Sequence, residues 1–296
     1  MSERTTETRM IDGHRIRLTS LDRVVYPSAG TTKGDVLDYL EGVAPALTAH
    51  AAGRPATRKR WMSGVGTADE PGEAFFHKNL DDDAPSWMRS YVIRHADHTN
   101  RYPLLEDAAT VVWFGQRGAL EFHVPQWRFR AGGAHEPPDR LVLDLDPGEG
   151  VDLAATVRVA VLARGALDAE GLPCVPVTSG SKGMHLYAPL DGSLDVDGAN
   201  ALAHRLAARL EEDHGDLVTA NLRKARREGR VLVDWSQNNG AKTTVVPYSP
   251  RGRMRPAAAV PRHWDELDDS LVQLELGRAL ERARTGDDPL AALLET

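Results

Sequence analysis

The centre of the sequence contains the run Leu141-Val142-Leu143-Asp144-Leu145-Asp146-Pro147-Gly148, in which aliphatic residues alternate with two carboxylates before a Pro-Gly pair. An apolar run of this length that stops at Pro-Gly predicts a buried strand followed by a turn. Side chains two apart on a strand emerge on the same face, so Asp144 and Asp146 are expected to converge at the strand's end. The run therefore predicts a pair of acids presented at one end of a sheet.

Further helices and strands are predicted on both sides of this run. Helical spacing of apolar residues predicts helices over 32–50, 104–116, 153–170 and 197–213. Short apolar runs predict strands over 11–19, 119–124, 174–178, 184–190, 231–234 and 243–248. This mixture, without an internal repeat, predicts an α+β (mixed α/β) architecture with helices packed on a sheet.

Charge is distributed unevenly along the chain. The net charge is −7, and the segment from Asp265 to Thr296 holds nine acidic residues and three arginines, which is −6 for that segment alone. The remainder is close to neutral and holds three basic clusters: Arg58-Lys59-Arg60; Arg223, Lys224, Arg226, Arg227 and Arg230; and Arg251, Arg253 and Arg255. An acidic total therefore does not exclude a polyanionic ligand, because a local basic cluster can bind one.

The composition indicates the cellular compartment of the protein. The chain is 41% hydrophobic and has no run of about 18 apolar residues, so no membrane association is expected. The N-terminus lacks the apolar segment of a secretion signal, and the one cysteine, Cys174, lies in an apolar stretch that predicts a buried structural thiol. These features predict a cytoplasmic protein.

A third acid follows another apolar run, because Asp234 comes directly after Val231-Leu232-Val233. Like charges at this spacing repel unless a cation compensates, which makes a divalent metal the natural partner of Asp144, Asp146 and Asp234. Three acids at strand ends suit a two-metal site of Mg²⁺ or Mn²⁺ better than zinc, since the sequence has no Cys/His cluster. The alternative is a solvated Asp-x-Asp-Pro-Gly turn.

The segment Ser179-Gly180-Ser181-Lys182-Gly183 lies between two predicted strands. Small residues let backbone N–H groups approach an anion, and the lysine adds a positive charge, so the loop predicts a phosphate cradle without Walker spacing. His185 follows on the next strand and could donate a hydrogen bond to a phosphate oxygen. The alternatives are an ordinary turn and a core histidine.

The order of these motifs resembles the archaeo-eukaryotic primase superfamily. The three motifs are Asp144-Leu-Asp146-Pro, Ser179-Gly-Ser-Lys182-Gly-Met-His185-Leu-Tyr187 and Val233-Asp234-Trp-Ser-Gln237-Asn238. The flanking segments resemble the polymerase domain of bacterial ATP-dependent DNA ligase D and its stand-alone relatives, from about residue 10 to 265: Thr31-Thr32-Lys33-Gly-Asp, Arg58-Lys59-Arg60-Trp61, Phe75-Phe76-His-Lys78-Asn79, Leu120-Glu121-Phe122-His123-Val124-Pro125 and Pro247-Tyr-Ser-Pro-Arg251-Gly-Arg253.

The resemblance implies a primase-polymerase core with a mainly antiparallel sheet flanked by helices. It implies an N-terminal elaboration that recognises DNA ends over residues 1–135, a catalytic core over 136–265 and an acidic C-terminal helical tail over 266–296, as one compact unit overall. The implied activity is template-directed, metal-dependent nucleotidyl transfer that adds ribo- or deoxyribonucleotides at gaps and broken ends in DNA repair.

The resemblance also implies roles for individual residues. Asp144, Asp146 and Asp234 would be the catalytic metal ligands, and the residues implied to bind the nucleotide are Ser179, Lys182, His185, Arg251, His123, Gln237, Lys242 and Arg227. The residues implied to bind DNA and its 5′-phosphate are Arg23, Lys33, Lys59, Arg60, Phe75 and Phe76. The family tends to have Asn at the position of Ser20 and Lys at that of Arg23. The alternatives are that Lys33 and Lys59 are ordinary surface lysines, and that one of the two phenylalanines lies in the core.

Two other functions compete with gap filling. The first is a primase that starts chains de novo, and the second is a non-catalytic module that bridges DNA ends, which has little use for three acids facing DNA phosphates. The expected partners are DNA with gaps or 5′-phosphorylated ends, NTPs or dNTPs, a DNA ligase and Ku. A chain that starts at Met1 and ends after an acidic tail is expected to be a free-standing, nucleoid-associated polymerase that recruits its ligase. The alternative is a domain excised from a longer protein.

Overall fold

The computed structural model describes residues 6–294, and the chain divides into two compact units. Unit 1 comprises residues 1–124, 245–258 and 275–287, and unit 2 comprises residues 125–244, 259–274 and 288–296. This division differs from the three consecutive segments expected from the sequence, because the chain returns to each unit more than once. The segment 266–296, expected to form a separate tail, contributes residues to both units.

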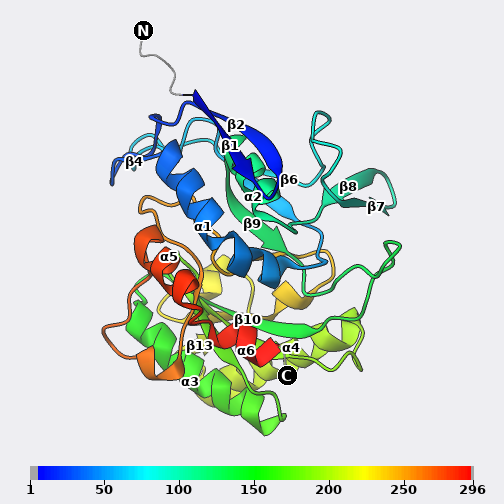
Figure 1. Ribbon diagram of the computed structural model, residues 1–296. Helices are drawn as coiled ribbons and strands as arrows, with labels where there is room; N and C mark the ends of the chain where they lie inside the picture. Colours follow the sequence, from blue (N-terminus) through cyan, green and yellow to red (C-terminus); the bar gives the residue numbers. More distant parts are fainter. Residues whose placement is uncertain (1–5, 295–296) are drawn as a thin grey trace. The chain divides into compact units, whose positions relative to one another are not determined.

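Unit 1 is built around helix α1 and a four-stranded sheet in the order β15-β9-β5-β6. Its elements are β1 (Thr6–Ile11), β2 (His14–Thr19), β3 (Val24–Tyr26), β4 (Thr31–Thr32), α1 (Lys33–Ala51), β5 (Thr57–Arg60), β6 (Phe75–His77), β7 (Ser90–Arg94), β8 (Thr99–Pro103), α2 (Ala108–Gln116), β9 (Ala119–Val124) and α5 (Leu276–Thr285), with β15 (Thr244–Val245) at its boundary. Both α2 and α5 pack against α1 (Figure 1).

Local sequence explains the start of α1. The Thr32 side chain accepts a hydrogen bond from the Asp35 N–H, and the Asp35 carboxylate accepts one from the Thr32 N–H, which is a capping box. The helix predicted over 32–50 is therefore confirmed. Of the strand predicted over 11–19, residues 14–19 form β2, whereas Ile11 ends β1, because Asp12 and Gly13 have φ of 48° and 78° and form the turn of the β1–β2 hairpin.

Unit 2 contains a six-stranded sheet in the order β13-β14-β10-β12-β11-β16. Its elements are β10 (Arg140–Pro147), α3 (Leu153–Ala169), β11 (Val175–Thr178), β12 (Met184–Pro189), α4 (Val196–His214), β13 (Val218–Thr219), η1 (Lys224–Arg226), β14 (Val231–Asp234), η2 (Trp235–Asn238), β16 (Val260–Pro261), η3 (Trp264–Glu266) and α6 (Pro289–Leu294). All its strand pairs are antiparallel except β13 with β14. The mixed α+β class and the mainly antiparallel sheet are therefore confirmed.

The core of unit 2 lies between this sheet and the helices α3 and α4, which run side by side (Figure 1). Leu141, Leu143 and Leu145 of β10 are fully buried in that core. Residues between them must point to the opposite face, because side chains alternate along a strand. Packing of the leucines therefore fixes the direction of Asp144 and Asp146.

The strand predicted over 243–248 is much shorter in the structure. Pairing continues only through β15, and Tyr248 then takes a left-handed φ of 65° in the segment Pro247-Tyr248-Ser249. A proline lacks the N–H that a ladder needs, and a left-handed residue turns the chain out of strand direction. The segment that carries Arg251 is therefore a loop.

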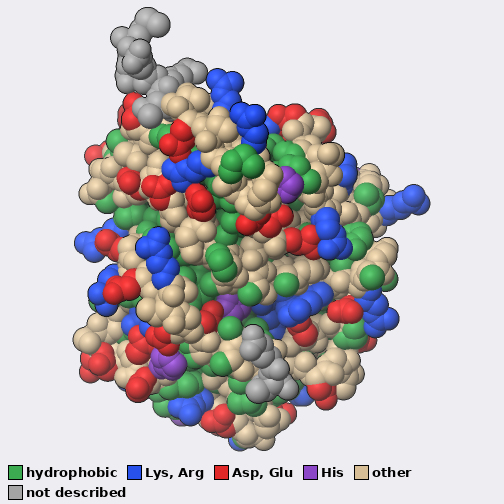
Figure 2. Space-filling model, viewed as in Figure 1, with side chains coloured by type: hydrophobic (Ala, Val, Ile, Leu, Met, Phe, Trp, Pro, Cys, Tyr) green, Lys and Arg blue, Asp and Glu red, His purple; other side chains and the backbone are tan. Residues whose placement is uncertain are grey.

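Cys174 is buried, as the sequence predicted, and burial raises the pKa of its thiol to about 12. Figure 2 shows acidic and basic side chains interspersed over the face in view. Among residues 6–294, no helix is both long enough and apolar enough to cross a membrane.

Candidate active site

Three carboxylates share one face of the unit 2 sheet. Asp144 of β10 lies directly opposite Asp234 of β14 in an antiparallel pair, and Asp146 follows two residues along β10. Residues directly opposite in such a pair project to the same side. The Asp144 side chain is 24% exposed and that of Asp146 is 51% exposed. The structure thus brings the three predicted acids to the sheet face away from the leucine core, where solvent and ligands can reach them.

Each of these acids has a local donor. Asp234 Oδ1 accepts hydrogen bonds from the Ser236 backbone N (2.9 Å) and from Ser236 Oγ (2.6 Å). The Gln237 amide nitrogen lies 3.2 Å from Asp234 Oδ2 and 3.5 Å from Asp144 Oδ2. Gln237 therefore spans the two opposed carboxylates with the positive end of its amide dipole.

The remaining neighbours of the acids are cationic or can become so. His185 of β12 lies opposite Asp144 in the register, with Nε2 3.4 Å from Asp144 Oδ1. Arg227 Nη1 lies 3.4 Å from Asp146 Oδ2, and Arg227 Nη2 also donates to the Leu222 carbonyl. His185, Gln237 and Arg227 thus contact the acids directly, whereas Lys242 is an exposed residue of the loop before β15.

The donor chemistry of this face suits a hard divalent cation. Carboxylate oxygens are the ligands that Mg²⁺ and Mn²⁺ prefer, and the amide of Gln237 between two acids marks where positive charge is favoured. As the side chains lie, no three His, Cys, Asp or Glu residues within 6–294 are grouped closely enough to share one ion. The three acids have the oxygen ligands that such a cation prefers, and their strands place them on one sheet face. To bind it, Asp234 and Asp146 would give up their contacts with Ser236, Gln237 and Arg227.

The predicted phosphate loop connects β11 with β12. The Ser179 N–H donates to the Gly183 carbonyl (3.0 Å), and the Ser181 N–H donates to Ser179 Oγ (3.2 Å), which closes the loop on itself. A Cβ at Gly183 would lie 2.0 Å from the Leu145 carbonyl oxygen, so only glycine lets the loop approach β10 this closely. Lys182 projects from the loop as an exposed residue, while Ser179 is buried.

A residue outside all the predicted motifs holds this loop. The Gln273 amide oxygen accepts from the Gly180 N–H (2.6 Å), and its amide nitrogen donates to the Gly183 carbonyl (2.9 Å). One side chain therefore bridges both halves of the loop. The sequence carried no signal for Gln273, because it lies in the segment expected to be an acidic tail.

Unit 1 contains a second cluster, around Glu121 on β9. His123 Nε2 lies 2.8 Å from Glu121 Oε2, and Arg251 Nε lies 3.4 Å from Glu121 Oε1. The Lys59 side chain lies over the Trp61 and Phe76 rings, and Lys59 pairs with Glu121 in the register. The nucleotide candidates His123 and Arg251 are thus brought together by a carboxylate that no predicted role covered.

Electrostatics in this cluster favour an ionised Glu121. Burial alone would raise the pKa of the Glu121 carboxyl, but the His123 hydrogen bond and the charges of Arg251 and Lys59 hold it well below its usual range. Burial lowers the pKa of His123 in spite of the neighbouring carboxylate. His123 is therefore neutral near pH 7, and the hydrogen bond to Glu121 assigns its proton to Nε2.

Phe75 and Phe76 are both exposed, at 42% and 58%, so neither lies in the core as one alternative expected. The Arg60 side chain makes hydrogen bonds within the protein: it donates to the Arg117 carbonyl (2.9 Å) and to Asp81 Oδ1 (3.1 Å). Its guanidinium also lies over the Phe75 ring. Arg60 is therefore held within unit 1 rather than projecting freely toward a ligand.

Arg23 and Lys33 form a pair at the start of α1. The Lys33 N–H donates to the Arg23 carbonyl (2.7 Å), and Lys33 Nζ donates to the Thr19 carbonyl (2.9 Å). Lys33 is only 5% exposed, and burial together with the charge of Arg23 lowers its pKa to about 8. Lys33 is thus not an ordinary surface lysine. The contacts of Lys59 lead to the Glu121 cluster instead, and not to this pair.

Ser20, which precedes this pair, has a left-handed φ of 57°. Asparagine tolerates that conformation better than serine does. The backbone at this position therefore favours the Asn that the resemblance implied there.

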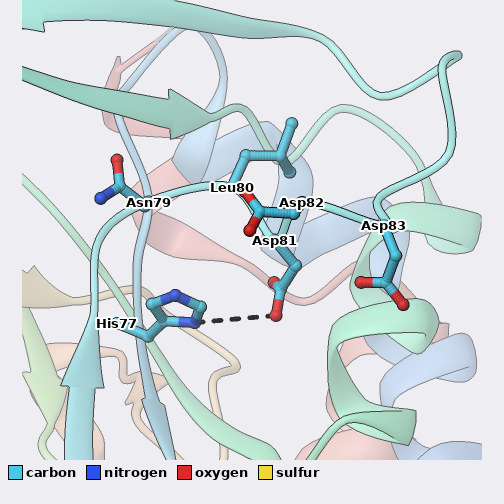
Figure 3. Close-up of a pocket in the computed structure, with 6 residues that line it drawn as sticks. All are labelled: His77, Asn79, Leu80, Asp81, Asp82 and Asp83. Atoms are coloured by element: carbon cyan, nitrogen blue, oxygen red, sulfur yellow. Dashed lines mark ion pairs between the residues drawn. The ribbon is translucent and has the colours of Figure 1, made fainter.

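One pocket of unit 1 has a different character. It has a volume of about 440 Å³ and is lined by His77, Asn79, Leu80, Asp81, Asp82 and Asp83 (Figure 3). Asp81 is ion-paired with Arg58 and Arg60, and it lies 3.8 Å from His77. Three aspartates on its wall disfavour a phosphate ligand, and none of the predicted site residues lines it.

Comparison with known proteins agrees with these features. The family described as LigD, primase-polymerase domain, matches residues 32–290. The multifunctional non-homologous end joining DNA repair protein LigD of Mycobacterium tuberculosis is 51% identical over 280 residues, which cover 92% of this chain and 36% of that protein. The bifunctional non-homologous end joining protein LigD of Bacillus subtilis is 29% identical over 259 residues, which cover 87% of this chain and 40% of that protein.

A solved structure agrees as well. The polymerase domain from Mycobacterium tuberculosis ligase D, in complex with DNA, matches with a TM-score of 0.89 and 49% sequence identity, covering 95% of this chain and 98% of that chain. The antiparallel sheet with its opposed acids and Gly/Ser loop is thus the fold of a primase-polymerase. The chain belongs to the family of LigD primase-polymerase domains, as its motifs predicted. It spans about a third of the length of its mycobacterial relatives.

Proposed function

We propose that the chain is a template-directed, metal-dependent nucleotidyltransferase that extends a primer strand at gaps and broken DNA ends. The observation that carries this proposal is the register of three strands, in which Asp144 has Asp234 on one side and His185 on the other, with Asp146 two residues further on. Acids that face each other on one side of a sheet suit metal-assisted phosphoryl transfer and serve no evident packing purpose. The DNA-bound relative supports a DNA substrate for this chain.

In the proposed reaction the 3′-hydroxyl of the primer attacks the α-phosphorus of a nucleoside triphosphate. A new P–O bond forms, the bond from the α-phosphorus to the bridging oxygen breaks, and pyrophosphate leaves. Mg²⁺ or Mn²⁺, when bound, neutralises charge on the reacting oxygens. Asp144, Asp146 and Asp234 are the residues that would hold it.

The remaining site residues would bind and orient the nucleotide. In unit 2, Lys182 supplies a full positive charge beside the backbone N–H groups of its loop, and His185 and Ser179 supply hydrogen-bonding groups. In unit 1, Arg251 supplies a positive charge and His123 an imidazole that we propose for nucleotide binding. Gln237 and Arg227 now contact the acids. When a cation binds the acids instead, these two side chains would become available to contact the nucleotide.

We further propose that Arg23 and Lys33 receive the 5′-phosphate on the downstream side of a gap. Lys33 is buried at a helix start with a lowered pKa, in part because of the charge of Arg23, and an anion between the two cations would stabilise both. The exposed rings of Phe75 and Phe76 would stack on template bases, at about 1–3 kcal/mol per base. A DNA ligase and Ku are the partners that an end-joining role would require.

One assay tests the function as a whole. Duplexes with a short gap, with and without a downstream 5′-phosphate, are incubated with Mg²⁺ or Mn²⁺ and either NTPs or dNTPs, and primer length is followed on a gel. We expect template-directed extension that needs the metal and is stronger with the 5′-phosphate. Extension on a template without a primer would favour a de novo primase. DNA binding without any extension would favour the end-bridging module.

A further inference from the structure

Glu121 is a buried carboxylate at the centre of the unit 1 sheet. Its side chain is 2% exposed, on strand β9 between two fully or nearly fully buried neighbours, Leu120 and Phe122. Burying a charge costs free energy unless the charge is paired and hydrogen-bonded, so the role of Glu121 depends on the groups that its carboxylate contacts.

The two oxygens of Glu121 have separate partners. Oε2 accepts the hydrogen bond of His123 Nε2 at 2.8 Å. Oε1 accepts the Gly252 N–H at 3.0 Å and lies 3.4 Å from Arg251 Nε. One carboxylate therefore contacts two side chains proposed for the nucleotide, although these are far apart in the sequence.

The loop that carries Arg251 is held in place by other contacts. Tyr26 Oη donates to the Arg251 carbonyl (2.9 Å), and Tyr39 Oη donates to the Tyr248 carbonyl (2.8 Å). Ser249 Oγ accepts from the Phe122 N–H (2.9 Å). A Cβ at Gly252 would lie 2.2 Å from the Trp61 ring, so the backbone there is closely packed. Glu121 adds one backbone contact, from the Gly252 N–H, to a loop that these other groups already hold, and its remaining contacts are with the side chains of His123 and Arg251.

We propose that Glu121 is a positioning residue for the nucleotide site: it holds the His123 ring through the hydrogen bond to Nε2, so that Nδ1 is the ring atom left for a ligand, and it orients the Arg251 side chain through the ion pair between Oε1 and Nε. This inference rests on the proposed nucleotide role of His123 and Arg251. It concerns a residue that contacts neither substrate nor metal in that role.

Because Glu121 is negatively charged, electrostatics and positioning predict opposite changes in nucleotide affinity when the charge is removed. Lys59, Arg251 and Glu121 are the charged groups around His123, so removing the one negative charge leaves the cluster more positive. By simple electrostatics, Glu121→Gln should bind a triphosphate more tightly. By positioning, it should bind more weakly, because the amide holds a guanidinium less firmly than a carboxylate does.

The experiment measures kcat and the nucleotide KM for single-nucleotide gap filling on a 5′-phosphorylated duplex, with dATP opposite a template T. We expect Glu121→Gln to raise KM about tenfold while kcat changes less than about threefold. In the His123→Ala/Arg251→Ala background the same change should raise KM less than about twofold, since the groups it orients are gone. Glu106→Gln, which alters an ion-paired carboxylate elsewhere in unit 1, should leave both constants unchanged.

An unchanged or lower KM in Glu121→Gln, or an equal KM rise in the double-variant background, overturns the proposal. Circular dichroism and urea unfolding establish that each variant is folded. If Glu121→Gln does not fold, Glu121→Asp is used, which keeps the charge but draws it back by one methylene and must raise KM in the same way; an unchanged KM there overturns the proposal. Failure of the proposed function is distinguishable, because then the wild type extends no primer, or His123→Ala and Arg251→Ala leave KM unchanged.

Discussion

Asp144 and Asp234 face each other across two antiparallel strands, where like charges would repel if nothing compensated them. In the protein, the Gln237 amide lies between the two acids, Ser236 donates to the other oxygen of Asp234, and His185 Nε2 lies 3.4 Å from Asp144 Oδ1. A metal ion can displace hydrogen bonds from an amide or a hydroxyl at small cost. It could not displace a buried arginine that already neutralised the two acids. At the scale of single residues, these contacts support the proposal that the three acids bind a divalent cation.

We expect Asp144→Asn, Asp146→Asn and Asp234→Asn each to reduce gap filling by roughly 100-fold or more, because each removes an oxygen charge worth several kcal/mol to the transition state. DNA affinity should be equal or higher, since a negative charge is lost. Gel-based extension and fluorescence anisotropy on the same gapped duplex measure the two effects. Near-normal extension by any one variant would remove that residue from the proposed metal site.

Lys33 gives a residue-scale prediction in pH. Because burial and then Arg23 lower its pKa to about 8, Lys33 is charged below that pH in the free protein and becomes neutral above it. A 5′-phosphate needs the charged form, so its advantage in gap binding should shrink several-fold between pH 7 and pH 9.5, where Arg23 and the phosphate keep their charges.

Lys33→Arg is the matched variant for this test, because arginine stays charged throughout that range. Binding of gapped duplexes with and without the 5′-phosphate is compared at each pH by anisotropy. The wild-type ratio should fall with pH and the Lys33→Arg ratio should stay flat. A wild-type ratio that does not change with pH would argue against Lys33 as a phosphate ligand.

At the scale of elements, three separate contacts hold the loop between β11 and β12, which we propose binds phosphate. Its ends are set by the β11–β12 pairing, its close approach to β10 requires Gly183, and its width is set by Gln273 from a different part of the chain. A Gly/Ser loop left to itself has a large conformational entropy. The Gln273 bridge removes part of that freedom before a ligand arrives, which is the condition for tight phosphate binding.

We expect Gln273→Ala to raise the nucleotide KM roughly 3- to 10-fold with kcat less affected, because one or two hydrogen bonds of about 1 kcal/mol each are lost from the loop. Gln273→Glu should be worse, since it keeps the acceptor for Gly180 but loses the donor to Gly183 and adds a negative charge near the triphosphate. Steady-state kinetics with varied dATP measure both. Equal constants for wild type and Gln273→Ala would mean that the loop is held well enough without the bridge.

At the scale of the whole molecule, the two units are not consecutive pieces of the chain. The segment after Asp265, which carries most of the negative charge, contributes Leu271 to the core of unit 2 and helix α5 to unit 1. Its strong charge and its buried apolar residues are compatible because α5 is amphipathic, with Leu276 and Ala279 buried and its arginines exposed or ion-paired.

We therefore expect a chain that ends at Asp265 not to fold cooperatively. Three buried leucines, Leu271, Leu276 and Leu290, would be lost at about 2 kcal/mol each, comparable with the 5–15 kcal/mol by which typical domains are stable. Leu290→Ala alone should lower the melting temperature while extension persists. Calorimetry and gap filling on both proteins test this, and a truncated chain with a normal melting transition would contradict it.

Much of the active-site sheet could be predicted from the sequence because its signals are local. The two-residue spacing of Asp144 and Asp146, the apolar run before Asp234 and the Gly/Ser loop each depend only on neighbouring residues and on the period of a strand. The order of these motifs then predicted the family, which the comparisons confirm.

Only the tertiary structure decided which side chains meet. Glu121 and Arg251, and likewise Gln273 and Gly180, are far apart in the chain, and no periodicity relates them. The state of Lys33 also depends on packing, because a lysine at a helix start is normally solvated, and here burial beside Arg23 changes both its exposure and its pKa. The spacing of neighbouring residues determines strands and loops. The free energy of a buried charge depends instead on residues that are distant in the sequence and come into contact only when the chain folds.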